Sequence, residues 1–316
     1  MLEFEKIISL LPSATEILFE LGLEDRLMGV THECTYPPGA LNKPKIIQPS
    51  FDVKNLDSSE IDKKIKEMSY NDQPIFALNS EKIKDINPDL IISQDICEVC
   101  APFKREVQQI YSFLDYNPRN ISLNPESITD IFNSITMIGK EVGNLGKALK
   151  LVQELTKRIE YIEQEIKRSI LAYEIKKQKI VCLEWVSPFY VAGHWIPEMV
   201  EIAGGINGIS KPADSSRLIS LAEIMEFDPD KIIFMPCGFD IDRTGKEVMA
   251  LNNAKNWNSL RAVKMKEVYL VDASSYFSKP SPRIIIGLEV LAKIIHPDLF
   301  YGLRVPPRSY MRIESD

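Results

Sequence analysis

The sequence is poor in the residues from which most metal centres and disulfide frameworks are built. It has three histidines and five cysteines among its 316 residues. An odd number of cysteines in a chain of this size does not predict a disulfide framework, and it favours a reducing compartment. There is no G-x-G-x-x-G or P-loop sequence of nucleotide sites and no G-x-S-x-G motif of hydrolases. The sequence therefore lacks the motifs of a nucleotide-dependent enzyme or a hydrolase.

Long apolar runs are also missing. No window approaches about 18 apolar residues, so the sequence predicts no membrane-spanning helix. The start, Met1-Leu2-Glu3-Phe4-Glu5-Lys6, contains two acidic residues and no apolar stretch typical of a secretory signal. We therefore expect a cytoplasmic protein, with the extracytoplasmic face of the membrane as the alternative if a leader was removed. The net charge of −7 argues against a nucleic-acid partner.

The residues that are present alternate between strand and helix patterns in two halves. Such alternation predicts an α/β fold with mostly parallel central sheets and helices on both faces. The expected strands of the first half are Ile7–Leu11, Met28–Thr31, Asp89–Ser93 and Ile121–Leu123. Those of the second half are Ile180–Glu184, Lys231–Met235 and Val268–Asp272.

A long helix is expected between the two halves. From about Leu145 to Lys177 the chain has no proline, and apolar residues recur every three or four positions. Such a helix would be roughly 50 Å long, and we interpret it as a rigid connector between two lobes rather than as a coiled coil. The predicted domains are an N-terminal lobe over residues 1–143, a linking helix over 144–178 and a C-terminal lobe over 179–316.

Chemically unusual side chains follow the predicted strands at the points where these strands end. Glu33 and Cys34 follow the second strand, Gln94 the third, and Trp185 the first strand of the second half. In open α/β sheets, ligands bind beyond the carboxyl ends of the strands. Two such edges that face each other would form a cleft between the lobes, and this arrangement predicts a binding protein.

The loop from Trp185 to Trp195 is rich in aromatic residues. It contains Trp185, Phe189, His194 and Trp195, and Tyr276-Phe277 follow another strand of the same half. A single aromatic residue after a strand usually covers the core, but this concentration exceeds what that role needs. The residues indicate an apolar pocket with aromatic walls that fits a flat ligand.

Cysteines at the ends of strands leave two further interpretations open. Cys97 and Cys100 form one C-x-x-C pair between a strand and a helix, which allows a redox pair. A soft metal site is the second interpretation, with Cys34, Cys237 or His194 as additional ligands if the lobes close. Packing of small residues is the structural alternative to both.

Ser13 precedes the first expected helix, where it has two possible roles. Ser13-Ala14-Thr15-Glu16 fits a capping box, with Ser13 as the N-cap. The free backbone N–H groups of a helix start could also hold an anionic group of a ligand beside Ser13.

Several segments together resemble one family. Ile7–Glu16 with Leu21-Gly22-Leu23 is similar to the opening of the substrate-binding proteins of iron-siderophore and vitamin B12 ABC importers. The resemblance extends to Gly29-Val30-Thr31 with Tyr36-Pro37, to Asn87–Ile91, to Ala203-Gly204-Gly205 and to Pro282-Arg283. It covers almost the whole chain and is closest to the cobalamin-binding branch.

This resemblance implies two Rossmann-like lobes joined by one backbone helix, with the ligand between the lobes, and no enzymatic activity. It also implies an ABC transporter permease as partner, contacted by one acidic residue on each lobe. Glu81 matches the first of these positions, and Glu223, one residue out of register, is the candidate for the second. We expect a monomer.

The expected ligand is a corrinoid such as cobalamin. Trp185, Phe189, Trp195, Tyr276 and Phe277 would cover its macrocycle. Hydrogen bonds to its amide rim would come from Ser13, Glu33, Gln94 and His194, where His194 could instead bind the central cobalt. The predicted site also includes Cys34, Tyr36 and Cys97.

The sequence departs from the cobalamin binders in three respects. They have aromatic residues where this chain has Glu33 and Gln94, they lack the loop cysteines, and an importer's receptor needs an export signal. Two rival interpretations therefore remain: a cytoplasmic metal- or thiol-dependent protein that uses these cysteines, and a siderophore or haem receptor.

Overall fold

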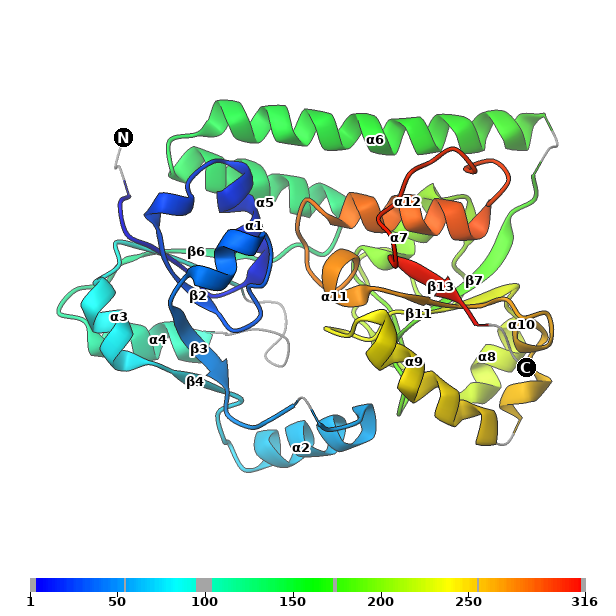
Figure 1. Ribbon diagram of the computed structural model, residues 1–316, viewed down its shortest axis with the longest axis horizontal. Helices are drawn as coiled ribbons and strands as arrows, with labels where there is room; N and C mark the ends of the chain where they lie inside the picture. The colour runs from blue at the N-terminus through cyan, green and yellow to red at the C-terminus, as the bar shows by residue number, and fades with distance from the viewer. Residues whose placement is uncertain (1–3, 54, 95–103, 173–174, 255, 314–316) are drawn as a thin grey trace. The chain divides into compact units, whose positions relative to one another are not determined.

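The computed structural model describes residues 4–53, 55–94, 104–172, 175–254 and 256–313 (Figure 1). The chain divides into two compact units. The first comprises residues 1–56, 60–125 and 129–154, and the second comprises residues 57–59, 126–128 and 155–316. Two short segments from the first half of the sequence therefore belong to the second unit.

The first unit is built on a six-stranded sheet in the order β4-β3-β2-β1-β5-β6. All neighbouring strands are parallel except β3 and β4. The strands are β1 (Ile7–Ser9), β2 (Leu27–Thr31), β3 (Lys45–Pro49), β4 (Phe76–Leu78), β5 (Leu90–Gln94) and β6 (Arg119–Leu123). The sequence did not indicate β3 or the three-residue edge strand β4.

The helices of this unit cover the sheet with apolar faces. Ile8, Ile46 and Ile91 of the sheet form a buried cluster with Ile83 of α3 and Ile110 of α4. The helices are α1 (Pro12–Glu20), α2 (Ser58–Tyr70, with its first two residues in the second unit), α3 (Ser80–Ile86), α4 (Lys104–Phe113) and α5 (Ile128–Glu141, with Ile128 in the second unit). Two 3₁₀ turns span Glu24–Arg26 and Pro38–Asn42.

The start of α1 corrects the predicted capping box at Ser13. Pro12 is the first helical residue and Leu11 is the N-cap, without a side-chain cap. Proline is favoured at the first helical position because its fixed φ suits a helix and its missing N–H costs nothing there. Ser13 consequently lies inside the first turn, where it is buried.

The second unit contains a seven-stranded sheet in the order β10-β8-β7-β11-β12-β13, with β9 paired to β7. Its centre, β7-β11-β12, is parallel, and the strands β8, β10 and β13 are antiparallel to their neighbours. The strands are β7 (Gln178–Trp185), β8 (Tyr190–Val191), β9 (Gly205–Ile206), β10 (Arg217–Leu218), β11 (Lys231–Phe234), β12 (Val268–Val271) and β13 (Tyr310–Arg312). Both sheets are thus mixed, with parallel centres, and the expected α/β fold with two lobes is confirmed.

The helices of the second unit surround a core in which Trp257 packs against Phe234. Helix α12 is almost entirely apolar and buried. The helices are α7 (Ile196–Ile202), α8 (Leu221–Phe227), α9 (Ile241–Ala250), α10 (Arg261–Lys264), α11 (Ala273–Tyr276) and α12 (Ile284–Ile295), with 3₁₀ turns at Leu251–Asn253 and Trp257–Ser259.

The long connecting helix is α6 (Leu145–Leu171), whose last 17 residues belong to the second unit. In that unit α6 lies beside α12 (Figure 1), where Arg158 Nε and Nη2 donate to the Glu289 carboxylate at 2.8 Å each. Ile166 of α6 contacts the chain at Gly204, where a Cβ would come within 3.0 Å of the Ile166 side chain. Arg158 and Ile166 therefore anchor the second half of α6.

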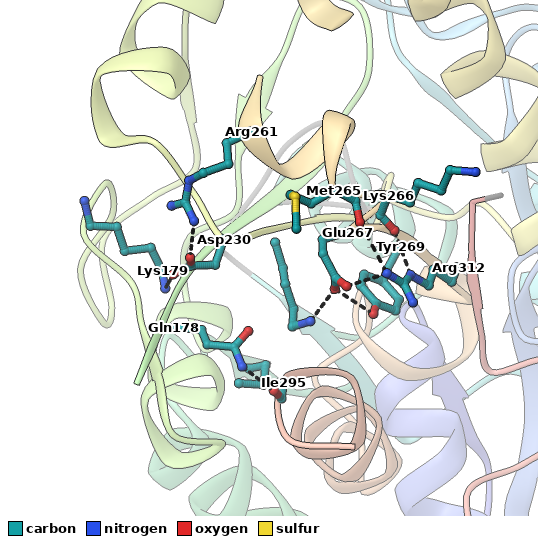
Figure 2. Close-up of polar contacts among 11 residues, drawn as sticks. Gln178, Lys179, Asp230, Arg261, Met265, Lys266, Glu267, Tyr269, Ile295 and Arg312 are labelled. Carbon is teal, nitrogen blue, oxygen red and sulfur yellow. Dashed lines mark hydrogen bonds and ion pairs between the residues drawn. The ribbon is translucent and has the colours of Figure 1, made fainter. Parts of the chain in front are cut away.

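A network of charged groups holds the amino-terminal edge of the second sheet (Figure 2). The carboxylate of Glu267 pairs with Lys231 Nζ and with Arg312 of β13, and it accepts a hydrogen bond from Tyr269 Oη at 2.9 Å. Burial and the bond to Glu267 raise the pKa of Tyr269. The network joins the starts of β11 and β12 to β13.

Candidate functional site

In the first unit, predicted site residues lie at the carboxyl ends of three neighbouring strands. Ser13 follows β1, Glu33 and Cys34 follow β2, and Gln94 ends β5. Because β2, β1 and β5 are adjacent and parallel, these residues share one edge of the sheet. Ser13, Cys34 and Gln94 are buried, whereas Glu33 is half-buried and Tyr36 is exposed.

Cys34 is a buried thiol between hydroxyl groups. Its Sγ lies 3.2 Å from Thr15 Oγ1 and 3.3 Å from Thr31 Oγ1, with either atom as donor. Burial raises the pKa of the thiol, and these hydrogen bonds only partly oppose the shift. A thiol kept protonated in this way is a poor nucleophile and a poor metal ligand.

A small cavity of about 120 Å³ opens beside Gln94. Its lining is polar but carries no charge, and Ser93 Oγ donates to Asn120 Oδ1 at 3.0 Å within it. The lining residues are Ser93, Gln94, Val107, Gln108, Tyr111, Asn120 and Ser122. Amides and hydroxyls of this kind hydrogen-bond neutral polar groups without selecting for an ion.

In the second unit, two aromatic rings and a guanidinium group pack together at the carboxyl ends of β7 and β11. The rings of Trp185 and Phe239 have centroids 5.4 Å apart, and the guanidinium of Arg243 lies 3.8 Å from the Phe239 centroid. Phe239 is buried between them, while Trp185 and Arg243 are half-buried. Burial lowers the pKa of Arg243, although Glu247 and Asp240 oppose this. Trp185 and Arg243 thus offer an aromatic surface and a positive charge side by side.

A second such contact is formed by Tyr276 and Arg283. The Arg283 guanidinium lies 5.7 Å from the Tyr276 ring centroid. Tyr276 ends α11, which is capped by Asp272 through a bond from Ser275 N to Asp272 Oδ1 at 3.1 Å. The predicted aromatic residue at position 276 therefore has a cation against it, which the sequence did not indicate.

Three other predicted aromatic residues pack into the interior of the second unit. Trp195 is 7% exposed, and its Nε1 donates to the carbonyl oxygen of Phe277 at 3.0 Å. Phe277 is itself buried, and Phe189 packs against Trp257 with ring centroids 6.0 Å apart. These side chains therefore pack beneath the loops that carry the site and do not form its surface.

His194 stands in a constrained position next to Trp195. Its φ is +54°, and the preceding Gly193 is required because a Cβ there would lie 2.4 Å from the Asp214 carbonyl oxygen. Within the described part of the chain, the buried Nδ1 of His194 has no hydrogen-bond partner. Burial lowers the pKa of His194, although Glu126 opposes this, so the imidazole is neutral near pH 7.

The remaining candidates can be placed only in part. Cys97 and Cys100 lie outside the described residues. Cys237 is half-buried after β11. Among the residues that the structure describes, no three His, Cys, Asp or Glu side chains gather into a metal-binding group.

The two acidic residues expected to contact a transporter differ in their surroundings. Glu81 lies in the first turn of α3 and is exposed. Glu223 forms a capping box with Ser220 at the start of α8, and its Oε1 accepts a bond from Arg217 at 2.9 Å. Hydrogen bonds from Ser220 N–H, Arg217 and the Ser220 hydroxyl lower the pKa of Glu223.

Phe239, Arg243 and Arg283 were missed by the sequence reasoning. One signal was available: Asp240, a good N-cap, stands between Phe239 and a helical stretch in which Arg243 follows at a spacing of four. That pattern places the ring and the guanidinium on the same side of a helix start.

The chain has two α/β units, and polar and aromatic side chains lie at the carboxyl ends of their central strands. This arrangement is typical of the solute-binding proteins of importers. The sequence matches the periplasmic binding protein family over residues 7–274, and the chain belongs to that family. It is a solute-binding protein and not an enzyme. Membership implies a small-molecule ligand and a transporter partner.

Two curated proteins and one solved structure illustrate the relationship. An uncharacterised ABC transporter substrate-binding lipoprotein of Bacillus subtilis is 28% identical over 94% of this chain and 82% of the relative. A vitamin B12-binding protein of Vibrio cholerae is 23% identical over 90% of this chain and 87% of the relative. A periplasmic haem-binding protein of Pseudomonas aeruginosa has the same fold, with a TM-score of 0.71 at 15% identity over 93% of this chain and 94% of that one.

The expectation of a cytoplasmic protein is wrong. The matching family is one of periplasmic binding proteins, and the Bacillus subtilis relative is a lipoprotein. Both findings point to the extracytoplasmic side of the membrane. Across the described residues, no helix has the length and apolarity needed to cross a bilayer.

Proposed function

We propose that this protein captures a corrinoid outside the cytoplasmic membrane and delivers it to an ABC transporter. The proposal rests first on the half-buried Trp185 ring, which packs at a tilt of 55° against Phe239 at the carboxyl ends of β7 and β11. An indole in this position can cover the apolar face of a macrocycle. Similarity to vitamin B12-binding proteins over 90% of the chain supports the same ligand class.

The uncharged lining of the cavity beside Gln94 favours a corrinoid over a ligand with charged side chains. A corrin ring carries neutral amide arms, whereas haem carries carboxylates. The cavity beside Gln94 presents amides and hydroxyls and no ion. Gln94, Glu33 and Tyr36 are the residues that we assign to the amide rim, and the neutral imidazole of His194 is a further candidate. Four of the predicted site residues are buried and would hold the site loops in place without contacting the ligand: Ser13, Cys34, Trp195 and Phe277.

A haem receptor is the second candidate, because Arg243 and Arg283 bring two guanidinium groups to the strand ends of the second unit. Guanidinium groups pair well with carboxylates. Arg243→Gln separates the two candidates. It should weaken a haem complex by about tenfold or more and change cobalamin affinity by less than about threefold.

An absorbance titration with cyanocobalamin, haemin and one ferric siderophore tests the function directly. We expect saturable binding of cyanocobalamin, and a Trp185→Ala variant that binds it about 10 to 100 times more weakly. Tyr301→Ala is a matched control, since Tyr301 is an aromatic residue of the same unit that is 86% exposed and more than 100 residues away from Trp185 along the chain. Failure of the wild-type protein to bind cyanocobalamin, with binding of haemin or the siderophore, would overturn the corrinoid assignment.

A further inference from the structure

Ser58 is a buried residue that contacts the candidate site of the second unit at Trp185. Residues 57–59 belong to this unit although they begin helix α2. Ser58 is 1% exposed, and its backbone N–H, its carbonyl oxygen and its hydroxyl oxygen all form hydrogen bonds. Its carbonyl oxygen accepts from Trp185 Nε1 at 3.0 Å, its Oγ accepts from Ser187 N at 3.1 Å, and its N–H donates to Glu247 Oε1 at 3.0 Å.

The bond from Trp185 fixes the orientation of the indole. Nε1–H is the single hydrogen-bond donor of a tryptophan side chain, so its acceptor decides how the ring is turned. Ser187, two residues further along, is bound by the hydroxyl of the same serine. One residue therefore holds the end of β7 at two points, directly beside the contact between Trp185 and Phe239.

The bond to Glu247 in turn fixes Ser58. The first N–H groups of a helix have no partner inside the helix, and a carboxylate at this end is stabilised by the helix dipole. Glu247 lies four residues after Arg243 on α9, so the helix that carries the cation of the site also carries the carboxylate that holds Ser58.

The second unit contains the same type of contact a second time, between α7 and the start of α5. Glu198 Oε2 of α7 accepts a hydrogen bond at 2.9 Å from the N–H of Ile128, the first residue of α5. Residues 126–128 also belong to the second unit. This contact has similar chemistry and provides an internal control.

We infer that Ser58, held by Glu247, is a positioning residue that sets the orientation of the Trp185 ring for ligand binding. This inference rests on the proposed function for its consequence, since the oriented ring is the surface that would cover the macrocycle. The orientation itself exists without ligand and can be tested separately.

The first test observes the indole N–H directly in the ligand-free protein. The chain has three tryptophans, so a ¹H–¹⁵N spectrum should show three indole signals, and the one missing in Trp185→Phe belongs to Trp185. We expect Ser58→Pro, which suits the first position of a helix but removes the N–H and the hydroxyl, to shift this signal. Glu247→Ala should shift it in the same direction. Glu247→Gln keeps an acceptor oxygen and should restore most of the wild-type position.

Glu198→Ala is the control, and it should leave the Trp185 signal unchanged. An unchanged signal in both Ser58→Pro and Glu247→Ala would overturn the inference, as would an equal shift in Glu198→Ala. Neither result depends on whether cyanocobalamin binds.

The second test measures the affinity for cyanocobalamin. Ser58→Pro and Glu247→Ala should each weaken binding by about threefold to tenfold, the equivalent of one hydrogen bond. In a Trp185→Phe background, where the indole bond is absent, neither substitution should add a further loss. Additive losses in that background would show that Ser58 acts on the ligand by another route and would overturn the positioning role. No binding by wild-type protein would remove the proposed function but leave the spectroscopic result intact.

Discussion

The two units contain the same helix–turn–strand segment with different chemistry. Each segment begins with a capped helix of seven residues, with Asn79 as N-cap in the first unit and Ser220 in the second. Each helix ends at a left-handed residue, Asn87 with φ 52° and Asp228 with φ 50°. The dipeptide Pro-Asp then leads into a central strand in both. A common backbone is thus specified by a cap, a residue that tolerates positive φ, and a proline.

The aspartates that follow these prolines have different partners. Asp89 of the first unit accepts the backbone N–H groups of Glu5 and Lys6 at 2.9 and 3.1 Å. Asp230 of the second unit accepts a backbone N–H of β7 at 2.7 Å and also binds the guanidinium of Arg261 at 2.5 Å (Figure 2). The first aspartate only connects strands, whereas the second also joins a charge network.

The next residue differs even more. Leu90 begins β5 as a fully buried apolar residue, and Lys231 takes the equivalent place in β11 at only 6% exposure. Glu267 pairs with this lysine. The comparison shows that the first position of a central strand can hold either a buried apolar side chain or a buried lysine. The lysine makes the stability of the second unit depend on the carboxylate of Glu267.

The largest effect is expected from Glu267→Ala, which would leave Lys231 buried without its carboxylate. We expect the free energy of unfolding to fall by about 3–5 kcal/mol, because an unpaired buried charge is costly. Lys231→Leu, which copies Leu90, should cost less than about 1 kcal/mol because Glu267 keeps Arg312 and Tyr269. Urea unfolding measures both. Equal losses in the two variants would contradict this account of the second unit.

A smaller effect is expected from the paired aspartates. Asp230→Asn should lower the free energy of unfolding by about 1.5–3 kcal/mol and Asp89→Asn by about 1 kcal/mol, since only Asp230 binds a guanidinium. Although burial raises the pKa of Asp230, the bonds from Lys179 N–H and Arg261 outweigh it and hold the pKa below its usual value.

This lowered pKa gives the effect at Asp230 a defined pH dependence. A carboxyl with a depressed pKa in the folded state stabilises the protein above its unfolded pKa, and the stabilisation is lost as the pH falls through about 4 toward the folded pKa. The difference between wild type and Asp230→Asn should therefore shrink as the pH is lowered through this range. Thermal unfolding at a series of pH values is the measurement, and a difference that grows toward acid pH would refute the sign.

The smallest effect on stability is expected at the two proposed transporter contacts. Glu223→Ala should lower the free energy of unfolding slightly through the lost capping box, and Glu81→Ala should lower it less because Glu81 forms no such box. Uptake of radiolabelled cobalamin by whole cells should instead fall more for Glu81→Ala, because the Glu223 carboxylate is already bound by Ser220 and Arg217. Uptake that is insensitive to Glu81→Ala, at wild-type ligand affinity, would remove Glu81 from the docking surface.

Much of the fold could be predicted because its central elements carry clear periodicity. The seven expected strands agree with the observed ones within about two residues at either end. The strands β8, β9 and β10 were missed because two residues are too few to show an alternating pattern. Helix α6 ends at Leu171, six residues earlier than Lys177.

Residues of the candidate site could be predicted from the sequence only where they lie at the end of a strand. Trp185 and Gln94 end β7 and β5, so the rule for strand ends located both. Arg243 could not be found in this way, because an arginine in a helix usually faces solvent and its contact depends on where α9 begins. Ser58 was hidden for the same reason: its role depends on contacts with Trp185 and Glu247, more than 120 residues away along the chain.

The division of α6 between the units has a practical consequence for work on fragments. A fragment beginning at residue 179 would lack the turns of α6 that carry Arg158 and Ile166, and it would leave Glu289 of the apolar helix α12 without its guanidinium. Such a fragment should be insoluble. Expression of the C-terminal half alone therefore calls for a start well upstream of residue 155, so that the shared helix is included.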